Sequence, residues 1–312
     1  MSFLLVAQQV LILFILIGVG FFCTKTKLLN ETVTKGITNL VLYCVTPCVL
    51  IKSFVEIPFS AQKVKELFLC LLISLLIHIG FILLSFPLIK DTDNSRERML
   101  RFCIIFSNAG FMGLPLQQAL LKEEGTFFGG AYVAMFNVVI WSFGLLLMSG
   151  DRKTLSVKKM FLTPGILGVL VGLVLFVLPQ IFPSFALPTL VFAPIEHLAN
   201  LNTPLPMLVI GYYLANTDLK SSLRDFKSFY VIFLRNIALP LVALGVMYLC
   251  GVRGNLLISL TISACAPTAA MSTMFAAKFD RHPGASCNIV SLTTLFAIIT
   301  MPLIVGLANI LA

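Results

Sequence analysis

Charged residues are scarce in this sequence. Asp, Glu, Lys and Arg make up only 11% of the 312 residues, against roughly 25% in an ordinary soluble domain. A chain with so few charges cannot build a water-exposed surface, so the composition excludes a soluble protein. No Asp or Glu lies deep in an apolar run, and Glu196 in APIEHLAN comes nearest. A proton antiporter that uses paired buried carboxylates is therefore not expected.

Motifs of intramembrane and metal-dependent enzymes are also missing. The chain contains no HExxH and no GxSxG, and its closest cysteines, Cys44 and Cys48, have helical spacing instead of a CxxC pattern. We therefore expect neither catalysis nor a bound metal or other cofactor. Sodium coupling stays open, because carbonyl groups freed in an interrupted membrane helix can ligate sodium without carboxylates.

Long apolar runs are what the sequence does have. Hydrophobic residues make up 59% of the chain, and runs of roughly 20, enough to cross a bilayer, recur along its whole length. We expect an all-α integral membrane protein without a separate soluble domain. Its ten predicted spans are 3–22, 31–54, 66–89, 98–121, 126–148, 160–182, 188–215, 228–250, 254–278 and 284–311.

Basic residues predict the orientation of these spans. Sixteen Lys and Arg lie in the joints that follow odd-numbered spans and five in the joints that follow even-numbered spans. By the positive-inside rule the first set is cytoplasmic, so both termini lie on the extracytoplasmic side of the cell (plasma) membrane. The net charge of +9 is divided among these joints and forms no continuous basic face. We therefore expect membrane lipid, and no nucleic acid, as a partner.

Five spans in each half of the chain, 1–150 and 151–312, would insert the halves upside down relative to each other. The segments VTPCVLI (45–51) and NTPLPMLVI (202–210) are alike and place Pro47 and Pro204 157 positions apart, and Pro115 and Pro267 are 152 apart. These similar offsets predict an inverted repeat. Such repeats with interrupted helices are typical of secondary transporters.

Two spans carry helix-breaking residues at repeat-related positions. Span four contains FSNAGFMGLPLQQALL and span nine contains SACAPTAAMSTMFAA. A proline at mid-span frees polar backbone groups that find no partner in lipid. We expect the two breaks to meet near the bilayer midplane, with new half-helices starting at about Leu116 and about Thr268 whose N–H groups hold an anion. A simple proline kink in each span is the alternative, which the pairing disfavours.

Candidate anion-binding residues lie at these breaks and at the repeat-related prolines of spans two and seven. They are Asn108, Ala109, Gly110, Pro115, Leu116, Asn137, Ala266, Pro267, Thr268, Thr46, Asn202 and Thr203. The Asn137 amide can donate to a carboxylate, but amides in membranes also link helices. For the residues of spans two and seven, helix capping is an equal alternative.

Two further polar residues are candidates for gating or for attracting the anion. Arg235 is the one cation well inside a predicted span, and Gln117 lies in the first turn of the expected half-helix. Ionisable groups within membrane spans are functional candidates. Arg235 is also close enough to the cytoplasmic end of its span to extend its charged group to the interface instead.

The segments SNAGFMGLPL (107–116) and CAPTAAMSTMFA (265–276) together resemble the auxin efflux carrier family. That family includes plant PIN auxin exporters and bacterial carriers of dicarboxylates such as malate and malonate, and the resemblance extends over essentially the whole chain. It identifies Asn108 with the crossover asparagine, Pro115 and Pro267 with the crossover prolines, and Asn137 with a polar residue of span five. The long cytoplasmic loop of the plant exporters is missing between spans five and six.

The resemblance also implies a fold and a mechanism. The fold is the inverted repeat shared with bile-acid symporters and sodium/proton antiporters, in which spans 1, 2, 6 and 7 form a scaffold and spans 3–5 and 8–10 a transport domain. An elevator mechanism and a homodimer are further implications.

From these observations we expect a secondary transporter of a small organic anion, a mono- or dicarboxylate such as malate, malonate or an auxin-like acid. Its carboxylate would bind where spans four and nine cross. The alternatives are a sodium-coupled symporter of a larger amphipathic anion of bile-acid type, an intramembrane enzyme, and a channel, for which a polar stripe along one span would be expected.

Overall fold

The computed structural model describes residues 3–155, 162–182, 185, 187–217 and 225–312, and these are predominantly helical. Seven helical stretches in this part of the chain are long and apolar enough to cross a membrane: Leu4–Lys25, Glu31–Val55, Ala61–Leu88, Ala109–Ser149, Pro164–Ile181, Phe226–Leu249 and Pro283–Leu311. The expectation of an all-α, multi-pass membrane protein is confirmed. The predicted spans four, seven and nine are each divided into shorter helices.

The described part of the first half of the chain contains seven α-helices and three π turns. They are α1 (Phe3–Lys25), α2 (Glu31–Leu40), η1 (Val41–Val45), α3 (Thr46–Val55), α4 (Ala61–Leu88), α5 (Asn94–Ile105), η2 (Ala109–Gly113), α6 (Leu114–Val139), η3 (Ile140–Gly144) and α7 (Leu145–Ser149). Side-chain caps fix several starts, because the side-chain oxygens of Asn30, Ser60 and Asp93 accept backbone N–H groups in the first turns of α2, α4 and α5. Helix α6 kinks at Lys122, whose φ is 53° and ψ is −133°.

The described part of the second half also consists of α-helices with short 3₁₀ and π turns. It contains η4 (Arg152–Thr154), α9 (Pro164–Ile181), α10 (Thr189–Ala199), η5 (Asn200–Asn202), α11 (Pro204–Ala215), α13 (Phe226–Phe233), η6 (Leu234–Ala238), α14 (Leu239–Leu249), α15 (Gly254–Cys265), α16 (Met271–Lys278) and α17 (Pro283–Leu311). The Thr163 hydroxyl accepts a first-turn N–H of α9, and Asp225 does the same for α13. Segment 200–203 separates α10 from α11 within the predicted span seven.

Three prolines lie just after π turns. Pro47 follows η1, Pro115 follows η2 and Pro240 follows η6, each within the first two residues of the next α-helix. A proline lacks the N–H of a regular helix and clashes with the carbonyl group four residues earlier. The wider π turn accommodates both effects. These three helices therefore continue through their prolines without a break.

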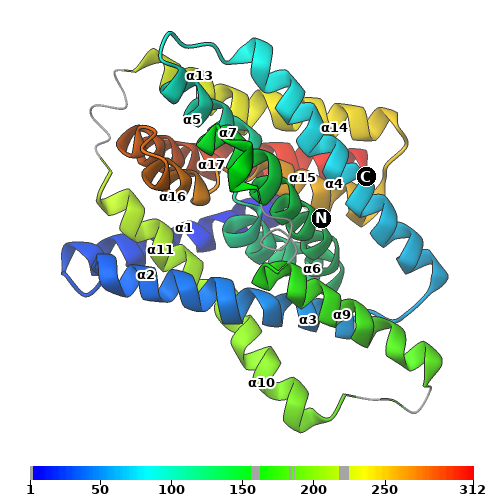
Figure 1. The fold of residues 1–312 in the computed structure, drawn as a ribbon. Helices are drawn as coiled ribbons and strands as arrows, with labels where there is room; N and C mark the ends of the chain where they lie inside the picture. Colours follow the sequence, from blue (N-terminus) through cyan, green and yellow to red (C-terminus); the bar gives the residue numbers. More distant parts are fainter. Residues whose placement is uncertain (1–2, 156–161, 183–184, 186, 218–224) are drawn as a thin grey trace.

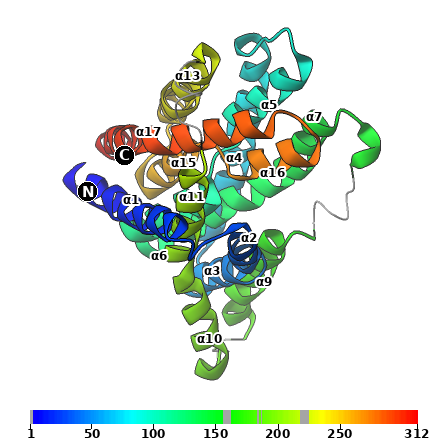
Figure 2. The ribbon, with the colours of Figure 1, turned by 90° about the vertical axis from the view of Figure 1, so that its left-hand side faces the viewer.

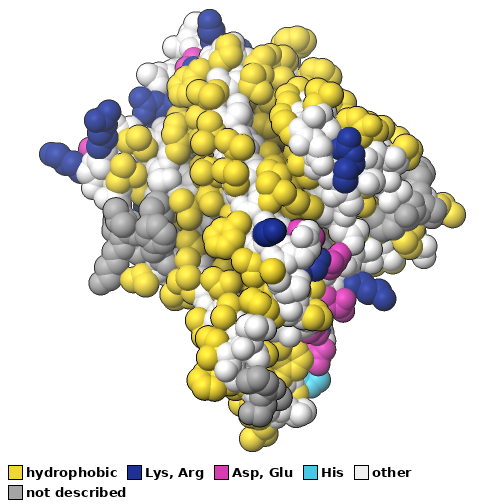
Figure 3. All heavy atoms as spheres, turned by 90° about the vertical axis from the view of Figure 1, so that its right-hand side faces the viewer, with side chains coloured by type: hydrophobic (Ala, Val, Ile, Leu, Met, Phe, Trp, Pro, Cys, Tyr) yellow, Lys and Arg dark blue, Asp and Glu magenta, His cyan; other side chains and the backbone are white. Residues whose placement is uncertain are grey.

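Helices distant in sequence pack into two groups. Helix α1 packs along α11, and α3 packs against α9 and α10, while α6 packs against α4 and α15, and α17 against α15 and α16. In Figures 1 and 2, α2, α3, α9 and α10 occupy the lower part of the molecule, and α4, α5, α13 and α17 the upper part. Hydrophobic side chains cover a broad area of the face in Figure 3. Such a face suits contact with lipid.

Candidate functional site

The predicted span four is interrupted at residues 106–108. Helix α5 ends at Ile105, Phe106 is extended with φ −97° and ψ 115°, and Asn108 has φ −79° and ψ 46°. The helix resumes at Ala109. The predicted span nine is interrupted in the same way, because α15 ends at Cys265, Ala266 has φ −59° and ψ 146°, and α16 begins at Met271.

The two interruptions touch and bond to each other. Ser107 and Thr268 form an antiparallel β-bridge. The Asn108 N–H donates to the Pro267 carbonyl oxygen at 2.7 Å, and the Ala269 N–H donates to the Phe106 carbonyl oxygen at 2.9 Å. Each break thus satisfies backbone groups that the other break frees, as an apolar surrounding requires. The prediction that the breaks of spans four and nine meet is confirmed.

The breaks are not placed as the prolines suggested. Pro115 does not interrupt span four, because η2 carries the helix from Ala109 into α6, and Leu116 lies inside α6 instead of starting it. Pro267 does lie within the second break, but α16 begins at Met271, three residues after Thr268. The bridge explains this shift, since residues 267–269 must stay extended to bond with residues 106–108.

A cavity of about 130 Å³ opens beside the crossing. Its walls come from both breaks and from α2, η1, α3, α6, η3, α9, α11 and α16. Polar residues on its wall are Thr38, Thr46, Ser107, Asn108, Asn137 and Thr163, and aromatic residues are Tyr43, Phe111, Phe136, Trp141 and Tyr213. No charged side chain lines it among the described residues. The site is therefore a small, largely apolar pocket with a few hydrogen-bonding groups, as ligand pockets usually are.

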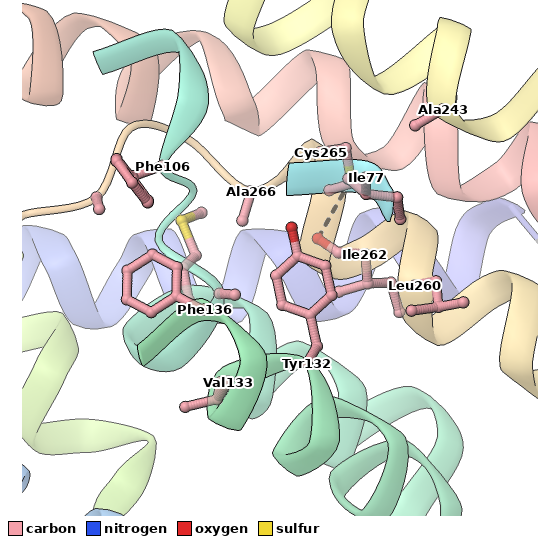
Figure 4. Packing of buried hydrophobic residues seen from close by; sticks show 14 of the residues in the cluster. Ile77, Phe106, Tyr132, Val133, Phe136, Ala243, Leu260, Ile262, Cys265 and Ala266 are labelled. Atoms are coloured by element: carbon pink, nitrogen blue, oxygen red, sulfur yellow. Dashed lines mark hydrogen bonds between the residues drawn. The ribbon is translucent and has the colours of Figure 1, made fainter. Parts of the chain in front are cut away.

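Aromatic packing supports the crossing from behind. Phe106 lies edge-on to Phe136 with ring centroids 5.8 Å apart. Figure 4 shows these two rings and Tyr132 gathered around Ala266 at the second break. All four residues are buried. This packing holds the extended segments in place, and Phe136 also forms part of the cavity wall.

Asn108 has its backbone fully bonded and its side chain free. Its carbonyl oxygen accepts N–H groups from Met112 at 3.0 Å and Gly113 at 3.1 Å. The side chain is only 6% exposed, yet its Nδ2 has no hydrogen-bond partner among the described residues. The neighbouring Ser107 hydroxyl is also buried without a partner. Buried polar groups are rarely left unsatisfied, so the Asn108 amide on the wall of the cavity is available to a ligand.

The predicted site residues fall into three sets. Asn108, Gly110, Asn137 and Thr46 line the cavity. Ala109, Ala266, Pro267 and Thr268 are buried at the crossing beside it. Pro115, Leu116, Asn202 and Thr203 are not on its wall. The prediction missed several lining residues, of which Ser107 stands directly before Asn108 and Thr163 before Pro164, whereas nothing in the sequence indicated Tyr43, Trp141 or Tyr213.

For Asn137 the alternative to a binding role was a bond that links two helices, and for Asn202 and Thr203 it was helix capping. The Asn137 Nδ2 donates to the Val133 carbonyl oxygen of its own helix at 2.8 Å, so this bond does not link two helices. The Thr203 side chain makes no capping bond at the start of α11. Both amide atoms of Asn202 are buried without a hydrogen-bond partner in the described structure, although Asn202 lies outside the cavity wall.

Gln117 and Arg235 contact the broken helices instead of the cavity. The Gln117 Nε2 donates to the Ser259 carbonyl oxygen at 2.9 Å and to the Ser263 hydroxyl at 2.7 Å, both on α15. Arg235 donates to carbonyl groups next to both breaks and is completely buried. The alternative that its charged group extends to the membrane interface is therefore wrong.

A multi-pass α-helical membrane protein with two interrupted helices bonded at their breaks, beside a small cavity, has the architecture of a membrane carrier. Comparison with known proteins agrees with this class. The model of the family described as "Membrane transport protein" matches residues 5–305, and the chain belongs to that family. This is the auxin efflux carrier family, so the resemblance seen in the sequence is confirmed. The chain is thus a member of a transporter family.

Two archaeal relatives match nearly the whole chain. An uncharacterized transporter of Methanothermobacter thermautotrophicus is 23% identical over 308 residues, which cover 97% of this chain and 98% of the relative. The uncharacterized transporter MJ1031 of Methanocaldococcus jannaschii is 26% identical over 308 residues, covering 94% of this chain and 96% of the relative.

Proposed function

We propose that this protein is a secondary transporter of a small organic anion whose carboxylate binds beside the crossing of the two interrupted helices. The observation that carries the proposal is the unsatisfied, buried Asn108 amide on the wall of the cavity. Two helix starts, at Ala109 and Met271, lie at the same crossing. The positive dipole ends of these helices favour an anion there.

The lining of the cavity narrows the substrate class. A cavity of about 130 Å³ is close to the engineered cavity of about 150 Å³ that admits benzene in another protein. Its wall carries five aromatic side chains and no cation. Within the expected range of mono- and dicarboxylates, these features favour one carboxylate on a small apolar or aromatic body, such as an auxin-like acid, over malate or malonate, whose second charge would lack a partner.

The position of the cavity supports alternating access. One wall consists of α2, α3, α9 and α11, and the other of the two breaks, α6 and α16. We propose that residues 1–150 and 151–312 are inverted five-helix repeats. Helices of spans 1, 2, 6 and 7 would form the scaffold, against which spans 3–5 and 8–10 move as an elevator. A homodimer in the plasma membrane with both termini extracytoplasmic completes this proposal.

The test of substrate class is a thermal-shift screen of organic acids on the purified protein. A ligand that binds only the folded state raises the midpoint of unfolding as its concentration rises. Aromatic and short aliphatic monocarboxylates should stabilise the protein, whereas dicarboxylates and the matching amides should not. Stabilisation by the amides as well as the acids would show that the site does not select for an anion.

The test of mechanism is transport in proteoliposomes. Saturable uptake with counterflow would support a carrier, and linear flux would favour a channel. The rival proposal, a sodium-coupled symporter of a larger amphipathic anion, predicts that uptake depends on sodium and that bile-acid-sized anions compete. A cavity of about 130 Å³ does not favour so large a substrate.

A further inference from the structure

Arg235 lies at the point where both interrupted helices end. It belongs to η6, between α13 and α14, and its side chain has 0% exposure. Its Nε and Nη2 donate to the Ala266 carbonyl oxygen at 3.1 and 2.8 Å, Nη2 also donates to the Ala264 carbonyl oxygen at 2.5 Å, and Nη1 donates to the Ile104 carbonyl oxygen at 3.2 Å. One guanidinium thus joins the end of α15 to the end of α5.

These carbonyl groups are the ones that a helix leaves without a partner at its C-terminus. Each C-terminal end also carries a partial negative charge of about half an electron. Two such ends converge on Arg235, and no carboxylate among the described residues forms an ion pair with it. The backbone dipoles of the crossing and the ring of Phe81, 5.7 Å from the guanidinium carbon, therefore surround the buried charge.

The helical segments that begin after the two breaks have their first residues at the cavity. Residues at the starts of η2 and α16, such as Gly110 and Met271, line its wall, whereas Arg235 does not. The crossing therefore separates charge: a fixed cation at the two C-terminal ends, and N–H groups for an anion at the two N-terminal ends. Converging carbonyl oxygens of this kind are also what binds sodium in interrupted membrane helices.

We propose that Arg235 is a built-in replacement for a coupling cation. Its guanidinium fills the cradle formed by the carbonyl oxygens of Ile104, Ala264 and Ala266, so the crossing is stable, and binds its anion, without sodium. The part concerning the anion rests on the proposed function. The part concerning the cradle stands on geometry alone, and it assigns Arg235 a positioning role, since the guanidinium acts through the backbone of the breaks.

The first test compares cations on the unchanged protein. The midpoint of unfolding should be equal in sodium, lithium, potassium and choline chloride at the same ionic strength and without any organic acid. A saturable rise in sodium relative to choline would overturn the proposal. This comparison needs no variant, so a variant that fails to fold leaves the proposal testable.

The second test empties the cradle. Arg235→Ala should lower the midpoint of unfolding, and small cations such as sodium or methylguanidinium should restore part of the loss in a saturable way, because they can enter the vacated cradle. Arg235→Lys keeps a charge and should stay insensitive to sodium. Arg253→Ala is the matched control, because Arg253 also donates to backbone carbonyl groups, that of Tyr248 at the end of α14 and that of Val252 in the following loop, but from an exposed position. No cation should rescue this control.

A destabilised Arg235→Ala that no cation rescues would reduce Arg235 to a packing role and overturn the inference. The proposed function fails by a different result. If no organic acid binds while the cation tests come out as expected, only the substrate class is wrong. If an acid binds only in the presence of sodium, the carrier assignment stands and the role of Arg235 falls.

Discussion

The Asn108 N–H donates to the Pro267 carbonyl oxygen at 2.7 Å, across two segments that are far apart in sequence. With the bond from Ala269 to Phe106, it fixes the backbone of both breaks. The side chain of Asn108 takes no part in these bonds. Changing that side chain should therefore leave the crossing intact, so that effects on binding can be separated from effects on folding.

Asn108→Ala should weaken binding of the organic acid while the protein stays folded. A hydrogen bond to a charged group contributes about 1.5–3 kcal/mol, so the expected loss is roughly ten- to hundredfold in Kd. The measurement is a thermal-shift titration with the best acid from the screen. Unchanged affinity would remove Asn108 from the site.

Asn108→Asp provides a sharper comparison at the same size. An added carboxylate beside the site should repel an anion and abolish its binding, without enlarging the cavity. Asn216→Asp is the control, because it adds the same charge at an exposed amide that, in the described structure, bonds to the Tyr212 carbonyl oxygen of its own helix. Retained anion binding in Asn108→Asp would contradict a carboxylate site at this position.

Gly20→Ala should destabilise the contact between α1 and α11. A Cβ on Gly20 would lie 2.7 Å from the Cα of Leu208 on α11, too close for any backbone to accept without moving. Overpacking of this kind costs about 1–3 kcal/mol. Gly18→Ala is the matched control two residues away on the same helix, since a Cβ there meets nothing within 4 Å. The midpoint of unfolding should fall for Gly20→Ala alone, and equal effects of the two changes would refute the close contact.

Gln117→Leu should lower stability and leave the affinity for the anion unchanged. The substitution removes two hydrogen bonds from Nε2 to α15 in a buried setting, at an expected cost of about 1–3 kcal/mol. Gln118→Leu serves as the control, because Gln118 is only half-buried and lies next to a different, polar cavity. A loss of anion binding in Gln117→Leu without a loss of stability would instead support the predicted gating role.

Asp91 should give the protein a component of stability that is lost in acid. The ammonium of Lys227, 2.7 Å from Oδ2, lowers the pKa of Asp91, and Arg96 contributes from 3.8 Å. Because the folded pKa lies below the unfolded value of about 3.9, the stabilisation is fully present above that value and disappears as the pH falls through the folded pKa.

The measurement is the midpoint of unfolding against pH for the parent protein and for Asp91→Asn. The parent should be more stable at neutral pH, and the difference should narrow below about pH 4. A constant difference across the whole range would mean that Asp91 acts by packing and not by its charge.

The sequence predicted the membrane fold and the touching breaks, because both follow from local rules. Apolar length indicates a membrane helix, and glycine, asparagine and proline in a span indicate an interruption. The rules misplaced the first break, however. Pro115 is the strongest helix breaker in its segment, but the wider turn of η2 accommodates it within the helix. The chain is extended at Phe106 instead. A π turn has no clear signal in a single sequence.

The lining of the cavity was predicted only in part for a related reason. Asn108 was found because a bare amide in an apolar run is conspicuous. Tyr43, Trp141 and Tyr213 could not be found, since an aromatic residue in a membrane helix can face lipid or a cavity equally well. The partners of Arg235 are carbonyl groups 29, 31 and 131 residues away, and only the folded arrangement brings them together.

The bridge between Ser107 and Thr268 also sets an order of events during biosynthesis. When the first half of the chain has entered the bilayer, the Asn108 N–H and the Phe106 carbonyl oxygen have no partner, because those partners, Pro267 and Ala269, emerge much later. An exposed polar backbone in hydrocarbon is costly, so the nascent protein must shelter this segment until residues 266–270 arrive. Closure of the crossing is therefore a late step of assembly, and an N-terminal fragment made alone should not persist in the membrane as a folded unit.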